Sequence, residues 1–144
     1  MRDATFTTSV RIEASPDEVF PYLINADLLI RWMGDYADLD PVSGGTYAVD
    51  INGVPIRGTF LELNPPQRLI FSWGVAGNDD FPVGSTTVEI TLTADRGGTL
   101  LELAHRDLPA DELPKHGIGW AHFLPRLVIA ASGNNPGPDP WNAL

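Results

Sequence analysis

Three histidines are the side chains of this chain best suited to proton transfer or to binding a polar ligand: His105, His116 and His122. His105 alternates with Leu101 and Leu103, so a strand here directs its imidazole ring to the same side as the two leucines. An imidazole that faces inward can bind a ligand or act as a general acid or base. The alternative is a histidine at a strand end that bonds only to the backbone or to water.

The sequence offers no support for other reactive chemistry. The chain contains no cysteine, which excludes a disulfide framework, a thiolate metal site and a thiol nucleophile. It has no G-x-S-x-G, P-loop or G-x-G-x-x-G motif. His116 and His122 are six residues apart on a helical segment and face different ways, and Asp38, Asp40 and Asp79-Asp80 are interpreted as solvated acids. We therefore expect no metal site and no cofactor.

The charge of the chain limits its partners. The formal net charge is −10, and lysine and arginine form no cluster, so nucleic acid and anionic membranes are not expected to bind. No apolar run reaches the roughly 20 residues that cross a bilayer, and the polar, alternating start of the chain does not resemble a secretory leader. We expect a cytoplasmic protein without a membrane span.

Strands joined by short turns must position these side chains. Residues 6–12 alternate between apolar and polar types, and Ser15-Pro16-Asp17-Glu18 then carries the cap, proline and acid of a helix start. A second short helix is expected over residues 27–32. Residues 36–106 follow as short alternating runs divided by turns such as Asn52-Gly53. This order predicts an α+β fold, with about six to seven strands in one antiparallel sheet.

The last apolar run, residues 116–132, predicts a long helix that covers the sheet. Its apolar positions recur at helical spacing from Trp120 onward, on one face. Gly117 and Gly119 remove side chains where the helix approaches the sheet, which leaves room for a ligand or for close contact. Whether Pro125 kinks the helix or divides it stays open. Residues 1–132 are expected to form a single domain, and residues 133–144 a Pro/Gly-rich irregular tail.

Several local motifs, in this order, resemble the START/Bet v 1-like (SRPBCC) superfamily, and within it bacterial proteins similar to the C-terminal domain of the activator of Hsp90 ATPase homologue (AHSA1-like). The motifs extend over most of the chain. They are Ala14-Ser15-Pro16-Asp17-Glu18-Val19-Phe20, Leu29-Ile30-Arg31-Trp32, Gly44-Gly45-Thr46-Tyr47, Pro65-Pro66-Gln67-Arg68-Leu69-Ile70-Phe71-Ser72-Trp73, Gly98-Thr99-Leu100-Leu101-Glu102-Leu103-Ala104-His105, and His116-Gly117-Ile118-Gly119-Trp120 followed by Phe123, Leu124 and Leu127.

This resemblance implies a helix-grip fold, in which a curved sheet wraps around the C-terminal helix and leaves an internal cavity. A packed core without a cavity is the alternative reading of the same aromatic stripes. The predicted ligand-binding residues are the inward strand positions, the helix stripe that faces them, and a mouth at the second helix: Trp32, Met33, Tyr47, Val49, Arg57, Phe71, Trp73, Val88, Leu103, His105, Trp120, Phe123, Leu124 and Leu127.

Three functions are compatible with such a fold. The first is a binding or carrier protein for an apolar or amphipathic small molecule, with His105, Arg57 or Tyr47 orienting the ligand. The second is a cyclase-, lyase- or hydrolase-type enzyme with His105 as acid or base. The third is a protein-interaction module, either a chaperone partner or a homodimer. Hsp90 is not expected as a partner, because the Hsp90 activators carry a separate N-terminal domain for which this sequence has no counterpart.

Overall fold

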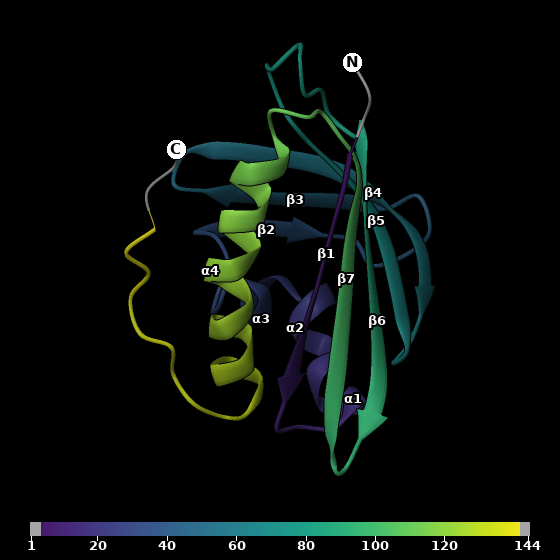
Figure 1. Ribbon diagram of the computed structural model, residues 1–144, viewed down its shortest axis with the longest axis vertical. Coiled ribbons are helices and arrows are strands. Elements are labelled where there is room, and N and C mark those ends of the chain that lie inside the picture. Colours follow the sequence, from purple (N-terminus) through teal and green to yellow (C-terminus); the bar gives the residue numbers. More distant parts are fainter. Residues whose placement is uncertain (1–3, 142–144) are drawn as a thin grey trace.

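A seven-stranded antiparallel sheet curves around a long C-terminal helix in the computed structural model, which describes residues 4–141 (Figure 1). Residues 1–3 and 142–144, the outer ends of the predicted domain and tail, lie outside the described residues. The elements in chain order are β1 (Ala4–Ile12), α1 (Pro16–Val19), α2 (Pro21–Ile24), α3 (Ala26–Leu29), β2 (Tyr36–Leu39), β3 (Thr46–Ile51), β4 (Val54–Asn64), β5 (Arg68–Val75), β6 (Thr86–Asp95), β7 (Gly98–Leu108) and α4 (Leu113–Ala131).

The sheet order explains the curvature. Strands β2 to β7 pair with their chain neighbours, and β1 closes the series beside β7, giving the order β1-β7-β6-β5-β4-β3-β2. In Figure 1 β1, β6 and β7 run upright, whereas β2 and β3 run across them behind α4. A sheet that turns this far presents a concave face to the helix. The predicted α+β helix-grip fold is therefore confirmed.

The turns follow from residues that tolerate a left-handed backbone. Asn52 and Gly53 join β3 to β4 with φ angles of 46° and 85°. Two consecutive positive φ angles define the type I′ hairpin turn that asparagine and glycine favour. This turn sets the register in which Val49 lies opposite Ile56, so both side chains reach the buried face.

Three short helices, rather than two, follow β1. Ser15 caps α1 by accepting a hydrogen bond from the backbone N–H of Glu18, as the sequence predicts. Pro21 has no N–H to continue that helix, so the chain restarts there as α2. The predicted second helix is α3, which begins one residue earlier than expected and ends three residues earlier.

The C-terminal helix α4 is one continuous helix that includes Pro125. It begins three residues before the predicted run, with Glu112 at the N-cap position and Pro114 in its first turn. Its buried stripe faces the sheet and is made of Trp120, Phe123, Leu124, Leu127, Ala130 and Ala131. No helix in residues 4–141 is long and apolar enough to cross a membrane.

Candidate functional site

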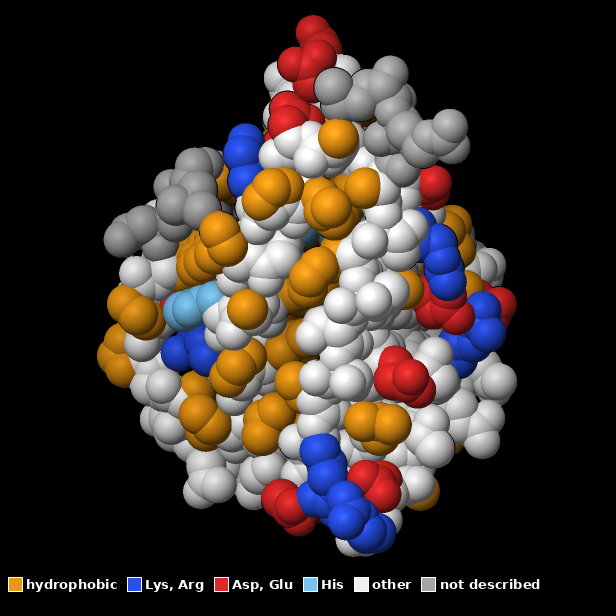
Figure 2. Space-filling model, in the orientation of Figure 1, with side chains coloured by type: hydrophobic (Ala, Val, Ile, Leu, Met, Phe, Trp, Pro, Cys, Tyr) orange, Lys and Arg blue, Asp and Glu red, His pale blue; other side chains and the backbone are white. Residues whose placement is uncertain are grey.

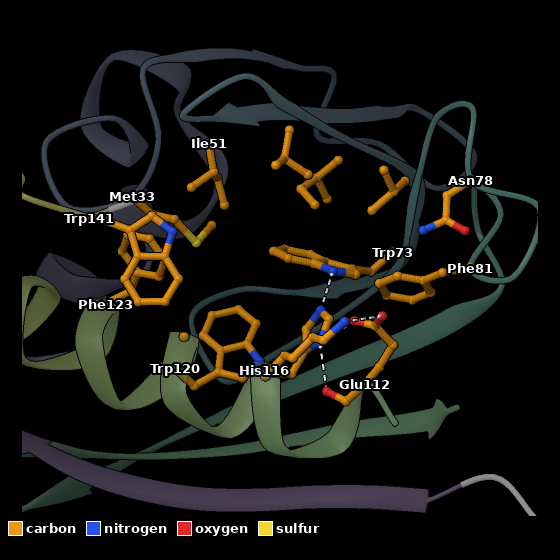
Figure 3. Close-up of a pocket in the computed structure, with 15 residues that line it drawn as sticks. Met33, Ile51, Trp73, Asn78, Phe81, Glu112, His116, Trp120, Phe123 and Trp141 are labelled. Atoms are coloured by element: carbon orange, nitrogen blue, oxygen red, sulfur yellow. Dashed lines mark hydrogen bonds and ion pairs between the residues drawn. The ribbon is translucent and has the colours of Figure 1, made fainter. Parts of the chain in front are cut away.

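A pocket of about 340 Å³ lies between the sheet and the N-terminal half of α4 (Figure 3). Its walls come from the ends of strands β3, β4 and β5, from the loop after β5, from α4 and from two outlying residues. The lining residues are Ile51, Val54, Ile56, Trp73, Val75, Asn78, Phe81, Glu112, Lys115, His116, Gly119, Trp120, Phe123, Met33 and Trp141. A volume of this size is at the lower end of the range for small-molecule sites.

Aromatic rings dominate the wall. The rings of Trp73 and Trp120 lie 5.4 Å apart between centroids at an angle of 45°, one from the sheet and one from the helix. Phe81 and Phe123 add rings from the β5–β6 loop and from α4. Such surfaces favour a flat apolar ligand, because indole and phenyl faces gain dispersion energy and edge-to-face contacts without desolvating a polar group.

Polar side chains line the pocket at the start of α4 and on the β5–β6 loop. Lys115 Nζ lies 3.5 Å from Glu112 Oε2, and His116 Nδ1 lies 3.5 Å from Glu112 Oε1. The Asn78 amide belongs to the same lining (Figure 3). The pocket therefore combines a long apolar wall with a cation, a carboxylate and an amide, a combination that suits an amphipathic molecule.

His116 is held in one neutral form. Its Nε2 accepts a hydrogen bond from Trp73 Nε1 at 3.2 Å, so the proton is on Nδ1, which donates to the Glu112 carbonyl at 3.1 Å. Burial lowers the pKa of His116, although the hydrogen bond and charge of Glu112 act in the opposite direction. The ring thus fixes the Trp73 indole and keeps the start of α4 close to the sheet.

His105 is fully buried beneath the pocket wall rather than in it. Its Nδ1 accepts from Trp120 Nε1 at 3.2 Å, and its Nε2 donates to Thr86 Oγ1 at 2.8 Å. The Thr86 hydroxyl in turn donates to the Trp73 carbonyl at 2.6 Å. Burial, with a smaller contribution from His116, lowers the pKa of His105 to about 2. With both nitrogens bonded and the ring neutral, His105 positions Trp120 and Trp73.

The two glycines of α4 have different surroundings. A side chain at Gly117 would meet the ring of Phe6 on β1 at 3.2 Å, so this glycine permits close approach of helix and sheet. A side chain at Gly119 would meet nothing within 4 Å, and Gly119 lines the pocket. The sequence predicted that these glycines leave room either for close contact or for a ligand. Gly117 serves close contact with the sheet, and Gly119 leaves open space in the pocket.

The structure brings only part of the predicted binding set into the pocket. Met33, Trp73, Trp120 and Phe123 line it. Trp32, Tyr47 and Phe71 border a second void of about 10 Å³, about the minimum size for one water molecule. The remaining apolar members are buried core residues: Val49, Val88, Leu103, Leu124 and Leu127.

Arg57 lies on the other face of the sheet. It follows Ile56, which faces the pocket, and successive strand residues point to opposite faces. Its guanidinium group pairs with Asp50 at 2.8 Å, and both side chains are about one-third exposed. The residues 4–141 contain no group of three or more histidine, aspartate or glutamate side chains placed to hold a metal ion.

The predicted binding set omitted several lining residues that the sequence pattern could have identified. His116 is four residues before Trp120 and so belongs to the same helix stripe. Ile51 has the same strand parity as Tyr47 and Val49. Trp141 stands in a polar, Pro/Gly-rich tail, where a large apolar side chain gains by packing against the domain.

The curved sheet, the gripped helix and the cavity between them define the helix-grip class of proteins, the architecture of the START/Bet v 1-like superfamily. Residues 13–131 match the family model described as activator of Hsp90 ATPase homolog 1-like protein, and the chain belongs to this family. No curated protein matches the chain.

Solved structures agree with this assignment. An AHSA1-like protein from Rhizobium etli is 38% identical, with a TM-score of 0.75 over 98% of this chain and 89% of its own. CalU16 from Micromonospora echinospora is 30% identical, with a TM-score of 0.74 over 90% of this chain and 76% of its own. The Aha1 dimer from Colwellia psychrerythraea, 23% identical, shares the fold with a TM-score of 0.77 over 90% of this chain and 97% of its own.

Proposed function

We propose that this protein binds an apolar or amphipathic small molecule, with a flat aromatic portion, in the pocket between its sheet and α4. The observation that carries the proposal is the pocket itself, about 340 Å³ in volume and walled by aromatic rings. A chain that needed only a stable core would be expected to cover this apolar wall, because apolar surface left open to water forgoes the free energy of burial. An open cavity of this kind is therefore better explained by a ligand.

The arrangement of the lining supports an oriented ligand. The apolar part would lie against the joined wall that the Trp73 and Trp120 rings form, and a polar substituent would reach Lys115, Glu112 or Asn78. These polar groups are few, with Glu112 and Lys115 at the start of α4 and Asn78 on the β5–β6 loop, and a few placed polar groups fix the orientation of a bound molecule. Because lysine and glutamate are both present, a neutral or zwitterionic head suits this end better than a doubly charged one.

The proposal does not extend to catalysis. His105, the predicted acid or base, does not line the pocket and uses both ring nitrogens within the protein. His116 lines the pocket, but its nitrogens bond to Trp73 and to the Glu112 carbonyl. A general acid or base must reach a proton on the substrate, and neither ring has a free nitrogen for that contact.

Binding can be tested with the uncharged fluorescent probe N-phenyl-1-naphthylamine, and Gly119 provides the blocking variant. Gly119→Leu places a side chain in the open space and is expected to weaken probe binding by about tenfold or more. Gly119→Ala is the matched control, which adds one methyl group and should change the affinity less than about threefold. Native mass spectrometry of the protein from its own host tests for a co-purified ligand.

Two results would overturn the proposal. One is a wild-type protein that neither binds the probe nor carries a ligand. The other is a Gly119→Leu variant that is folded, by circular dichroism, and binds the probe as tightly as the wild type does.

A further inference from the structure

The segment after α4, residues 133–141, folds back along the helix and ends at the pocket (Figure 1). We call it the C-terminal strap. It lies beyond residues 13–131, which match the family model, and it contains neither helix nor strand. Figure 2 shows apolar side chains gathered over α4 and the strap, with acidic side chains at the tip of the β5–β6 loop above them. At the end of the strap, Trp141 packs against the hydrophobic core of the domain.

Arg126 on α4 ties the strap to the short-helix region. Its guanidinium group donates to the carbonyls of Gly137 at 3.0 Å and Pro136 at 3.4 Å, both on the strap. It also donates to the carbonyls of Trp32 at 3.3 Å and Arg31 at 3.4 Å. One side chain thus joins helix, strap and the chain beside Met33, which itself lines the pocket.

Asp139 fixes the end of the strap. Its Oδ1 accepts from His122 Nε2 at 2.7 Å and from the backbone N–H of Trp141 at 2.9 Å. The Trp141 ring then packs on His122, with centroids 4.9 Å apart at 34°, and on Phe123, at 5.2 Å and 53°. Asp139 is not among the lining residues, so it positions Trp141 without itself facing the pocket.

Trp141 completes the pocket at the end opposite the polar groups. In Figure 3 it lies beside Met33 and Phe123, whereas Asn78 and Phe81 lie across the cavity. Every other wall residue belongs to the sheet, to its loops, to α4 or to the turn after α3. Backbone hydrogen bonds to Val75 on β5 hold the loop that carries Asn78 and Phe81, whereas side chains of α4, Arg126 and His122, hold the strap that carries Trp141.

A segment held by a few side chains opens at a lower free-energy cost than a strand or helix of the core. We propose that Trp141 is a ligand-contacting residue that determines specificity, and that the strap detaches to admit a ligand and closes over it. This inference rests on the proposed binding function. The closed strap limits the length of the bound molecule at this end, and its opening sets the rate of release.

The experiment compares probe binding by stopped-flow fluorescence in variants of the full chain. Trp141→Ala is expected to release N-phenyl-1-naphthylamine about tenfold faster, because it removes one wall and its dispersion contacts. Asp139→Ala loosens the end of the strap, where Trp141 stands, without changing a lining atom, and it should also raise the release rate. Because both act through one strap, the double variant should be less than additive.

Controls separate a pocket wall from a merely stabilising contact. Asn134→Ala alters the strap while leaving its backbone bond to Ile129 intact, and it should not change the release rate. Trp141→Phe keeps a ring and should retain most of the slow release. A longer probe, 1,6-diphenylhexatriene, should gain affinity in Trp141→Ala relative to the shorter probe, a change that loss of stability alone would not produce.

The outcomes distinguish the two proposals. If wild type binds and Gly119→Leu does not, but Trp141→Ala and Asp139→Ala release both probes as wild type does, the strap inference is wrong and the binding function stands. If wild type binds neither probe and carries no co-purified ligand, the binding function fails and the strap inference fails with it.

Discussion

The space between the sheet and α4 is filled at one end and hollow at the other, although both ends are lined by aromatic residues. At the filled end Tyr47 and Phe71 stack with centroids 4.1 Å apart at 17°, and the void that remains is about 10 Å³. At the hollow end the cavity is about 340 Å³. Trp120 borders both spaces and forms the partition.

The difference lies in what covers each end. The short helices supply Leu23 and Leu29 to the filled end, and both side chains are almost completely buried. The hollow end receives a glycine from α4, at Gly119, and a side chain from the strap, Trp141. Aromatic content therefore does not decide between core and cavity. The decisive factor is whether a second element brings side chains into the gap.

The largest expected effect comes from breaking the filled end. Phe71→Ala removes a ring that is 1% exposed and stacked on Tyr47, and it should lower the free energy of unfolding by about 3–5 kcal/mol. Phe123→Ala, beside the existing cavity, should cost at least about 1 kcal/mol less, because that ring borders open space as well as protein atoms. Urea denaturation of both variants measures the difference. Equal losses would contradict the contrast between the two ends.

The next effect concerns the two buried histidines that bond to Trp73 and Trp120, which are His116 and His105. The pKa of His105 is about 2 in the folded protein and 6.5 in the unfolded chain, so below pH 6.5 the unfolded state binds the additional proton. Stability is complete above that pH and falls as the solution is acidified, by about 1.4 kcal/mol per pH unit and about 2 kcal/mol at pH 5 for His105. His116, whose pKa is also lowered by burial, adds to the loss.

Urea denaturation at pH 7, 6 and 5 tests whether the free energy of unfolding falls as the pH is lowered. His105→Gln has no group that titrates in this range, so its stability should depend less on pH than that of the wild type does. A wild-type protein that is equally stable at pH 7 and pH 5 would show that neither ring is held neutral. Between pH 7 and pH 5 most carboxylates stay charged, so the change in the free energy of unfolding reports mainly on histidine protonation.

How far the sequence predicts this architecture depends on the level of detail. Alternation and helical spacing identify the buried face of each element, and Tyr47, Phe71, Trp73 and Trp120 are all buried. Periodicity does not show where along a strand the sheet separates from the helix. The pocket lies at the ends of β3, β4 and β5, whereas the predicted binding set was drawn largely from strand centres.

The periodicity of the sequence also could not predict that the strap contributes a wall of the pocket. Trp141 reaches the pocket through Arg126 and Asp139, two contacts between residues that follow no repeat. His105 shows the reverse case. Its inward direction was predicted correctly, but its role depends on Thr86 and Trp120, partners that only the folded chain brings together.

The smallest expected effect comes from Arg57, which the sequence placed among the ligand-orienting residues. Its neighbour Ile56 faces the hollow end, so the strand alternation directs the guanidinium group away from the pocket. Arg57→Gln should leave the affinity for N-phenyl-1-naphthylamine within about twofold of wild type. Because the ion pair with Asp50 is partly exposed, stability should fall by no more than about 1 kcal/mol. A large loss of probe affinity would mean that the ligand reaches the outer face of β4, and the hollow end would no longer account for binding.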